Sequence, residues 1–446
     1  MPKFDLNYSH LANAKMNILV TCFCCIVLLT IQLSHSASPS PSPRSIISIP
    51  LYHKKMLNST YITSRRIQHP HMETTSDIYP LNDAYAIFLW IGTPVQVVFV
   101  MIDIGSPISW SQCDLCNNCY PMQRPPFNTR ASSTFRQLGC YTDTCLIPMM
   151  REVFGNCTGW TCRYNVKYGT GDESHSFGAM VTDTLNFERS NTEVKNFIIG
   201  CGDSYEGPFR TQFSGVLGLG RGPLSVQSQL NAKAFSFCPV SQGSENPSFL
   251  EFYDTPPEMN QHGVVGDNSS IGIMVPLSEN SGYPFYYFLQ FVGIGINGFM
   301  LDIQSTVWGY GLNYDGGVII DIGTVLTYLP SDAYSVFRSE MLRTNHNLTV
   351  KPGYEGLEFC YKDDSSNVYP TIELYFQNGN IAGKNFVSYK LNKKQLLFTP
   401  EEGTVCLSFA EGKSSALTVI GSNQLQGTLL TYALVNEILV LTFNKC

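Results

Sequence analysis

Two apolar stretches of the sequence run into almost the same turn. The first reads FVMIDIGSPISW over residues 99–110, and the second reads GVIIDIGTVLTY over residues 317–328. Each is followed further along the chain by a short apolar segment that ends in glycine, GVLG at 215–218 and TVIG at 418–421. A supersecondary plan that occurs twice in one chain indicates two copies of one structural unit. We therefore predict two similar lobes that face each other across a pseudo-two-fold axis.

The length and composition fit two β-rich lobes. A chain of 446 residues exceeds what one hydrophobic core usually serves. Glycine (36), tyrosine (24) and phenylalanine (27) are frequent, which favours strands and turns. Short strands are expected on both sides of the turn at 92–94, and the best helix candidate spans 330–343. We predict an all-β, bilobed fold with lobes at 78–256 and 257–446 and a cleft between them.

The N-terminal region has the features of a secretory signal. An apolar run of about fourteen residues follows Lys3 and Lys15 and precedes small residues near position 37. Such a run is short for a bilayer, so we expect no stable membrane span after its removal, with an uncleaved signal anchor as the alternative. We predict a signal peptide at 1–37. Residues 38–77, which begin with SPSPSP and include a basic stretch, are predicted as a propeptide or linker, with a solvated arm as the alternative.

Twelve cysteines remain after removal of the signal, and an even number in a secreted chain indicates disulfide bonds. Zinc binding by the closely spaced cysteines at 113–119 is the alternative, although it suits a reducing compartment. Nine of the twelve precede residue 256 and three follow it, so complete pairing requires a bridge between the lobes. We expect Cys446 to make that bridge and Cys360 to pair with Cys406. The predicted disulfide cysteines are Cys113, Cys116, Cys119, Cys140, Cys145, Cys157, Cys162, Cys201, Cys238, Cys360, Cys406 and Cys446.

Two further features concern processing and partners. Four N-x-S/T sequons fit the secretory route, and they predict a glycoprotein. The net charge of −7 is mild and argues against a nucleic-acid partner. The glycosylation candidates are Asn58, Asn156, Asn268 and Asn347.

The repeated turn has a chemical consequence. An apolar strand that ends in aspartate and glycine presents a carboxylate at its tip, and the glycine permits close approach of the backbone. If the lobes meet at these tips, Asp103 and Asp321 lie within a few ångströms of each other. Two carboxylates that close share one proton, because both cannot ionise easily. One can then take a proton from water while the other donates a proton to a carbonyl oxygen, which cleaves peptide bonds without metal or cofactor.

At this point the chain resembles the pepsin-fold aspartic proteases, and most of all their plant nepenthesin-like branch with its additional cysteines. The resemblance runs from about residue 80 to the end of the chain. The matching segments are IGTPVQ, DIGS with Trp110 seven residues on, WSQCDLCNNCY, YGTG, TDTLNF, GVLGLGRGPLSVQSQL, FSFC, GGVIIDIGTVLTYLP, VCLSF and VIGSNQLQ. The resemblance implies a bilobed pepsin-like fold and a hydrolase that acts as an aspartic-type endopeptidase at acidic pH.

The resemblance also assigns roles to residues. Asp103 and Asp321 match the catalytic pair, and Ser106 and Thr324 match the hydroxyls that hydrogen-bond the outer carboxylate oxygens. The flap and substrate-binding positions are Tyr168, which closes over substrate, its hydrogen-bonding neighbour Trp110, and Val216 in the pocket for the residue preceding the scissile bond. An apolar side chain at that last position implies a preference for apolar residues at the cut.

The residue after each aspartate departs from the family pattern. Relatives have Thr or Ser there, with hydroxyls that span the lobe interface, whereas this chain has Ile104 and Ile322. Isoleucine keeps the β-branch of threonine but loses the hydroxyl, so several interlobe hydrogen bonds vanish. Two functions follow: an active endopeptidase, or a catalytically weak or inactive pepsin-fold protein that binds or inhibits other proteins in the plant extracellular space.

The resemblance further implies partners and location. We expect a monomer that binds a polypeptide substrate and needs no cofactor and no metal. The predicted location is extracellular, in the cell wall space, with the vacuole as the alternative destination. Synthesis as a zymogen follows from the predicted propeptide.

Overall fold

The computed structural model describes residues 45–53 and 85–444, apart from short internal gaps. The predicted signal peptide and the domain boundary at 256/257 lie outside the described residues, as do all four sequons. The gaps are 155–156, 158, 170–173, 188–191, 210–211, 241–247, 256–271, 312–314, 345–347, 355, 379–384 and 413–416. The segment Pro43–Cys446 forms one compact unit.

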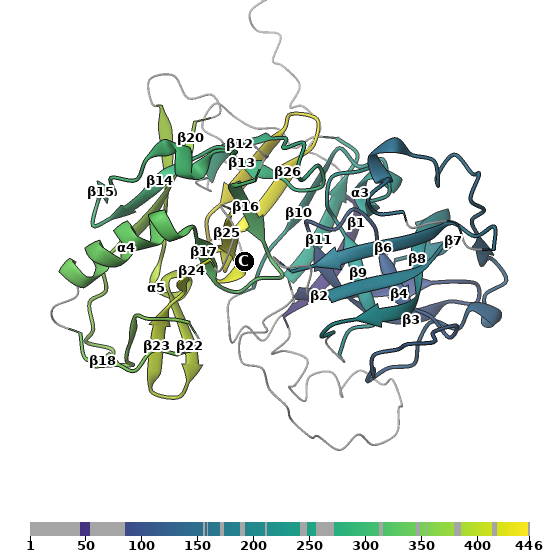
Figure 1. Cartoon of the computed structure of the whole chain (residues 1–446), viewed down its shortest axis with the longest axis horizontal. Coiled ribbons are helices and arrows are strands. Elements are labelled where there is room, and N and C mark those ends of the chain that lie inside the picture. The colour runs from purple at the N-terminus through teal and green to yellow at the C-terminus, as the bar shows by residue number, and fades with distance from the viewer. Residues whose placement is uncertain are drawn as a thin grey trace, which may run out of the picture. The chain divides into compact units, whose positions relative to one another are not determined.

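The first half of this unit is built from antiparallel strands with two short parallel pairings. The hairpin predicted around the turn at 92–94 is present as β2 and β3, which pair antiparallel. The strands are β2 (Tyr85–Ile91), β3 (Gln96–Asp103), β4 (Trp110–Gln112), β5 (Arg136–Gln137), β6 (Arg163–Tyr168), β7 (Ser174–Asn186), β8 (Glu193–Glu206) and β9 (Gly215–Gly218), followed by the short helix α3 (Val226–Gln229). Figure 1 shows these strands together, in blue and teal.

The second half repeats the plan and adds a longer helix. The helix predicted at 330–343 is present as α4 (Ser331–Thr344), and it buries Ala333, Tyr334, Phe337 and Met341. The strands are β13 (Phe288–Leu289), β14 (Phe291–Ile296), β15 (Phe299–Met300), β16 (Gly317–Asp321), β17 (Thr327–Leu329), β18 (Val350–Lys351), β19 (Cys360–Lys362), β20 (Ile372–Gln377), β21 (Phe386–Lys390), β22 (Leu397–Glu401), β23 (Thr404–Leu407), β24 (Phe409–Glu411) and β25 (Leu417–Gly421), with the short helix α5 (Lys393–Leu396) before β22. The prediction of an all-β fold with two lobes is confirmed.

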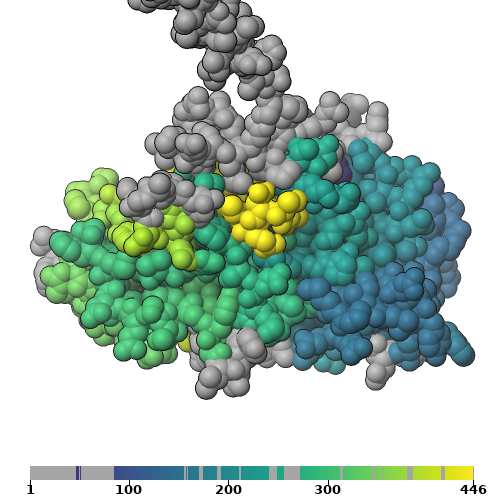
Figure 2. All heavy atoms as spheres, turned by 90° about the horizontal axis from the view of Figure 1, so that it is seen from above, coloured from purple at the N-terminus to yellow at the C-terminus, as the bar shows by residue number. Residues whose placement is uncertain are grey.

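A central antiparallel sheet joins the two halves. Its strands are β1 (Ser45–His53), β11 (Ser248–Tyr253), β10 (Ala234–Phe237), β26 (Leu429–Ala433), β27 (Ile438–Thr442) and β12 (Gly272–Ser278), in that order. β10 of the first half pairs directly with β26 of the second, and the rings of Phe235 and Tyr432 stack across this pair with centroids 4.8 Å apart. Strands β26 and β27 belong to the C-terminal part of the chain, which is yellow in Figure 2. There the yellow residues lie at the surface between green and teal residues.

Strand β1 comes from the segment predicted as propeptide or linker. It pairs antiparallel with β11, with Ile49 opposite Leu250, and its last two residues pair with β2. Ile47, Ile49 and Leu51 are all at most 5% exposed and belong to the main hydrophobic core. This part of the predicted propeptide is therefore an integral strand of the folded unit, because removing it opens the core.

A chain that begins at residue 78 should consequently be much less stable than one that begins at residue 43. Each buried isoleucine or leucine contributes about 1.5–3 kcal/mol, and the loss of three approaches the whole stability of a typical domain. We expect thermal unfolding of the shorter chain at a clearly lower temperature, with recovery when a peptide of residues 43–53 is added. The same peptide with serine at 47, 49 and 51 is the control. Equal unfolding temperatures of the two chains would show that β1 is dispensable.

Candidate active site

The backbone around Asp103 is fixed by a close crossing of two chain segments. Asp103 ends β3, which runs parallel to β9 with Asp103 opposite Gly218. The chain then returns past β9 as β4, with Trp110 opposite Val216. A Cβ atom at Gly218 would lie 2.3 Å from the carbonyl oxygen of Ile108, so only glycine fits here. The Asp-containing loop is thereby locked between two strands.

The second half repeats this arrangement at Asp321. β16 runs parallel to β25 with Asp321 opposite Gly421, and β17 returns antiparallel with Tyr328 opposite Val419. A Cβ atom at Gly421 would lie 2.3 Å from the carbonyl oxygen of Leu326. The internal repeat read from the sequence thus corresponds to two equivalent loops, each with its aspartate at the end of a strand.

Both carboxylates accept hydrogen bonds from their own turns. The N–H of Gly105 donates to Oδ1 of Asp103 at 2.7 Å, and the N–H of Gly323 donates to Oδ1 of Asp321 at 2.8 Å. The Thr324 hydroxyl donates to the other oxygen of Asp321 at 2.5 Å. Asp321 thus receives both a backbone and a hydroxyl donor.

The electrostatics of the two aspartates are linked. Burial, and next the charge of Asp321, raise the pKa of Asp103 to about 7, although backbone N–H groups of Gly105 and Ser106 act in the opposite direction. Water therefore screens the charge of Asp321 only weakly at Asp103. Both influences favour the protonated form of Asp103.

Ser106 has a different partner from the one that the family resemblance implies. Its hydroxyl donates to the carbonyl oxygen of Ile108 at 3.0 Å and lies 3.2 Å from the hydroxyl of Tyr168. The chain folds back after Asp103 and brings the Ile108 carbonyl oxygen close to the Ser106 hydroxyl. This backbone oxygen accepts the hydrogen bond of the serine. Ser106 therefore links the Asp103 loop to the tyrosine, whereas Thr324 contacts its aspartate directly.

Tyr168 and Trp110 lie together next to Asp103. The indole N–H of Trp110 donates to the Tyr168 hydroxyl at 2.6 Å, and the two rings have centroids 6.4 Å apart. Burial, and next the charge of Asp103, raise the pKa of Tyr168 above its ordinary value, so the phenol keeps its proton. Tyr168 is the last residue of β6, and the segment 170–173 that follows it lies outside the described residues.

Val216 lies on β9, the strand next to the one that carries Asp103. It is 4% exposed, pairs with Met101 on β3, and belongs to the cluster that contains Trp110 and Tyr164. Val216 and Trp110 therefore belong to the buried apolar core one strand away from Asp103.

Sequence reasoning missed a tyrosine from the second half. A Cβ atom at Gly105 would lie 2.3 Å from the Tyr286 ring, so this ring packs on the Asp103 turn. Tyr286 is also near enough to contribute to the raised pKa of Tyr168. The local sequence PFYYFLQ predicts a strand, and no local signal indicates that this ring reaches the opposite lobe.

The two isoleucines that replace Thr or Ser are fully enclosed. Ile104 is 3% exposed, Ile322 is 0% exposed, and both belong to the main core. Neither side chain offers a hydrogen bond across the interface.

The cysteines form disulfides rather than a zinc site. The cysteines at 113–119 are all oxidised. Cys360 pairs with Cys406, as expected from the sequence. Cys238 is also disulfide-bonded, whereas Cys446 lies outside the described residues, so the interlobe bridge stays a prediction. The pairs are Cys113–Cys201, Cys116–Cys119, Cys140–Cys157, Cys145–Cys162 and Cys360–Cys406.

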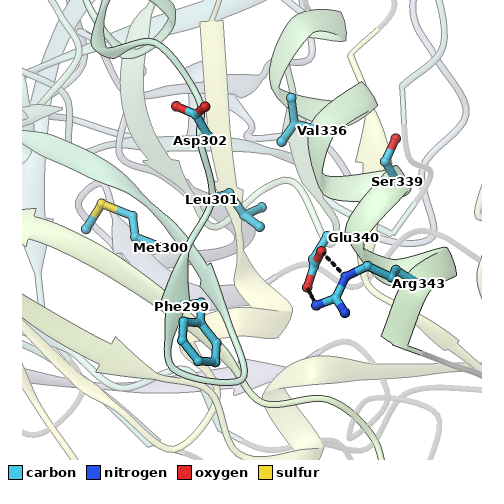
Figure 3. Close-up of a pocket in the computed structure, with 8 residues that line it drawn as sticks. All are labelled: Phe299, Met300, Leu301, Asp302, Val336, Ser339, Glu340 and Arg343. Atoms are coloured by element: carbon cyan, nitrogen blue, oxygen red, sulfur yellow. Dashed lines mark hydrogen bonds and ion pairs between the residues drawn. The ribbon is translucent and has the colours of Figure 1, made fainter.

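One pocket lies away from these residues in sequence, between the β15 turn and α4. It has a volume of about 420 Å³, and its charged wall consists of Glu340 and Arg343, which pair with each other (Figure 3). The other lining residues are Phe299, Met300, Leu301, Asp302, Val336 and Ser339. The pocket contains none of the predicted site residues.

Within the described part of the chain, no helix is long and apolar enough to cross a membrane.

Comparison with known proteins agrees with this geometry. Residues 85–253 match the family described as Xylanase inhibitor N-terminal, and residues 286–443 match Xylanase inhibitor C-terminal. The chain is 33% identical to the aspartic proteinase nepenthesin-2 of Nepenthes gracilis over 362 residues, which cover 80% of this chain and 77% of that protein.

Solved structures share the fold. The structure of edgp superposes with a TM-score of 0.66 at 18% identity, covering 90% of this chain and 96% of that one. The basic 7S globulin from soybean superposes with a TM-score of 0.62, also at 18% identity, covering 81% and 93%. Two equivalent Asp loops, a bilobed β fold and these matches lead to one conclusion. The chain belongs to the pepsin-like aspartic proteases that are built from the xylanase-inhibitor N-terminal and C-terminal domains.

Proposed function

We propose that the protein is an aspartic-type endopeptidase that hydrolyses peptide bonds at acidic pH with a water molecule activated between Asp103 and Asp321. The observation that carries this proposal is the pair of equivalent loops, each of which presents an aspartate at the end of a strand with a backbone N–H on its carboxylate. Burial and the charge of Asp321 raise the pKa of Asp103 to about 7, which is consistent with one shared proton. A pair of carboxyl groups with one proton supplies an acid and a base at the same place.

The hydrogen bonds suggest which carboxyl takes which role. Asp321, with donors from Gly323 and Thr324, is the better anion and takes a proton from the attacking water. Asp103 donates its proton to the carbonyl oxygen, which gives a gem-diol. The proton on Asp321 then passes to the leaving amide nitrogen, the C–N bond breaks, and a proton from the gem-diol returns to Asp103.

The neighbouring side chains support a peptide substrate with apolar residues at the cut. Val216 lies in the apolar core one strand from Asp103, and Tyr168, held by Trp110, is proposed to close over a bound peptide. The sequence features of a signal, a propeptide and sequons support a secreted glycoprotein, made as a zymogen, that acts as a monomer in the cell wall space. Processing of the zymogen has to leave β1 (Ser45–His53) in place, because this strand belongs to the core.

A second function is favoured by Ile104 and Ile322. The loss of both interlobe hydroxyls weakens the device that aligns the pair in relatives, and catalysis tolerates misplacement of only about half an ångström. The matching family is named for xylanase inhibition, and the fold is shared with seed 7S globulins. The alternative is therefore a pepsin-fold binding or inhibitor protein with weak or absent proteolysis.

Acidic proteolysis of an unstructured protein substrate separates the two functions. We expect cleavage at about pH 4 that a statyl transition-state analogue abolishes, because the analogue mimics the gem-diol between the carboxyls. The Asp321→Asn variant, which removes the base but keeps the shape, should show no cleavage above background. Circular dichroism confirms that the variant is folded. Equal residual cleavage by wild type and variant, insensitive to the analogue, would contradict the endopeptidase and leave the binding protein.

A further inference from the structure

A buried arginine reaches from the first half of the unit to the second directly behind the Asp103 loop. Arg221 follows β9 by three residues, and its side chain is 11% exposed. Its guanidinium forms two hydrogen bonds with the carboxylate of Glu437, at 3.1 and 2.5 Å, and lies 4.8 Å above the ring of Tyr287. Its backbone N–H donates to the carbonyl oxygen of Phe285 at 2.8 Å. Both the backbone N–H and the guanidinium of Arg221 therefore bind residues of the second half.

On the first-half side, the same segment holds the backbone that carries Asp103. The N–H of Leu219 donates to the Asp103 carbonyl oxygen at 2.8 Å, and the N–H of Gly220 donates to that of Ser106 at 2.9 Å. The side-chain amide nitrogen of Gln227 lies 2.9 and 2.7 Å from the carbonyl oxygens of Leu219 and Gly220, and 3.1 Å from the Tyr287 hydroxyl. Any displacement of Arg221 is thus transmitted to the Asp103 loop within two residues.

On the second-half side, the contacts lead to Tyr432. The Tyr287 ring lies 4.9 Å from the ring of Tyr432, which is fully buried on β26. Burial raises the pKa of Tyr432, and the charge of Asp321 adds to this rise. A continuous set of contacts therefore runs from the Asp103 loop through Arg221 and Tyr287 to Tyr432, on which the charge of Asp321 acts.

Glu437 has a backbone conformation that marks it out from an ordinary surface glutamate. Its φ is +51°, in the left-handed region that residues other than glycine, asparagine and aspartate rarely adopt. It occupies the turn between β26 and β27, where a glycine would fit without strain. Strained conformations persist where surrounding contacts demand them, and the contact here is the bidentate bond with Arg221.

We propose that Arg221, Glu437, Tyr287 and Gln227 form an interlobe clamp that positions the two aspartates, in place of the hydroxyls that Ile104 and Ile322 lack. The planar guanidinium fixes distance and orientation at once, because it accepts only one geometry with a carboxylate and one face of a ring. The residues of the clamp are positioning residues, since none touches a carboxylate of the pair. The kinetic part of this inference rests on the proposed protease function, but the positioning of the pair does not.

The Arg221→Met variant tests the clamp. Methionine keeps an apolar side chain on the Tyr287 ring but removes the ion pair. The function-independent readout is the fall in unfolding temperature between about pH 4 and pH 7 that Asp103→Asn abolishes. Its size depends on the burial of Asp103 and next on the nearby charge of Asp321, and a loosened interface between the halves reduces both. We expect this fall to shrink by about half or more in Arg221→Met. If the protein is a protease, kcat should fall about 10- to 100-fold while KM changes less than about threefold.

Two further variants separate positioning from plain stabilisation. Arg338→Met is the control, because Arg338 also binds both oxygens of one carboxylate, that of Glu358, through Nε and a terminal nitrogen, and does so at the surface within the second half alone. It should leave the pH dependence and kcat unchanged. Adding Ile104→Thr and Ile322→Thr to Arg221→Met should restore most of the pH dependence and most of kcat, since the hydroxyls then bridge the lobes. A lower unfolding temperature in Arg221→Met with unchanged pH dependence would overturn the clamp. A changed pH dependence in a protein that cleaves nothing would retain the clamp and reject only the protease.

Discussion

Replacing Asp103 with asparagine should stabilise the folded protein at neutral pH and remove much of its loss of stability above pH 4. Asp103 has a raised pKa of about 7 in the folded chain, caused by burial and by Asp321, against 3.8 for an ordinary aspartate. Between these values the folded state binds a proton that the unfolded state has released, so stability falls as the pH rises. A shift of this size corresponds to roughly 4 kcal/mol at most, and asparagine carries no charge to bury.

Thermal and urea unfolding at a series of pH values measure this effect. The difference between wild type and Asp103→Asn should grow between about pH 4 and pH 7 and then level off. Asp364→Asn is the control, because Asp364 is fully exposed and the Ser366 backbone N–H lowers its pKa instead. This control should not flatten the pH dependence. A constant difference between Asp103→Asn and wild type over the whole range would show that Asp103 ionises normally and that the two carboxyls do not interact.

The two interface isoleucines should behave as one unit when they are replaced by threonine. A single Ile104→Thr or Ile322→Thr places a hydroxyl in an apolar core site that is at most 3% exposed. We expect each single variant to lose about 1–3 kcal/mol, from the lost methyl group and the unpaired hydroxyl. The double variant should lose clearly less than the sum, because two hydroxyls can satisfy each other and the facing backbone.

A double-mutant cycle from urea unfolding measures this coupling. The matched control is Ile102→Thr with Ile320→Thr, which makes the same change one strand position before each aspartate, also in the buried core. Their losses should add, since these side chains belong to separate strands, β3 and β16. Additive losses for Ile104 and Ile322 as well would mean that the two side chains do not share one interface.

Much of the candidate site was predictable because its signals are local. An apolar strand, an aspartate and a glycine form a turn whose geometry depends only on neighbouring residues, and the repeat at Asp321 doubled that signal. The same holds for the hairpin at the 92–94 turn and for α4, whose apolar periodicity and Pro-Ser-Asp start lie within one segment.

The features that the sequence did not show depend on contacts that form only in the folded chain. β1 has the composition of a linker at its start, and only its pairing with β11, some 200 residues later, makes it a core strand. Ser106 donates to Ile108 rather than to its aspartate because the folded-back chain presents a nearer acceptor. Tyr286 and Arg221 have ordinary neighbours in the sequence, and their contacts belong to the opposite half.

The sequence by itself therefore determined the β-rich bilobed fold, the two aspartate turns and the oxidised cysteines, since each follows from short-range patterns that recur or pair by count. Only the tertiary structure decided which strand completes the core, which side chains surround the two carboxyls and how the halves are held together. The physical reason is that burial, charge proximity and interlobe hydrogen bonds depend on distances in space between residues that are far apart in the chain.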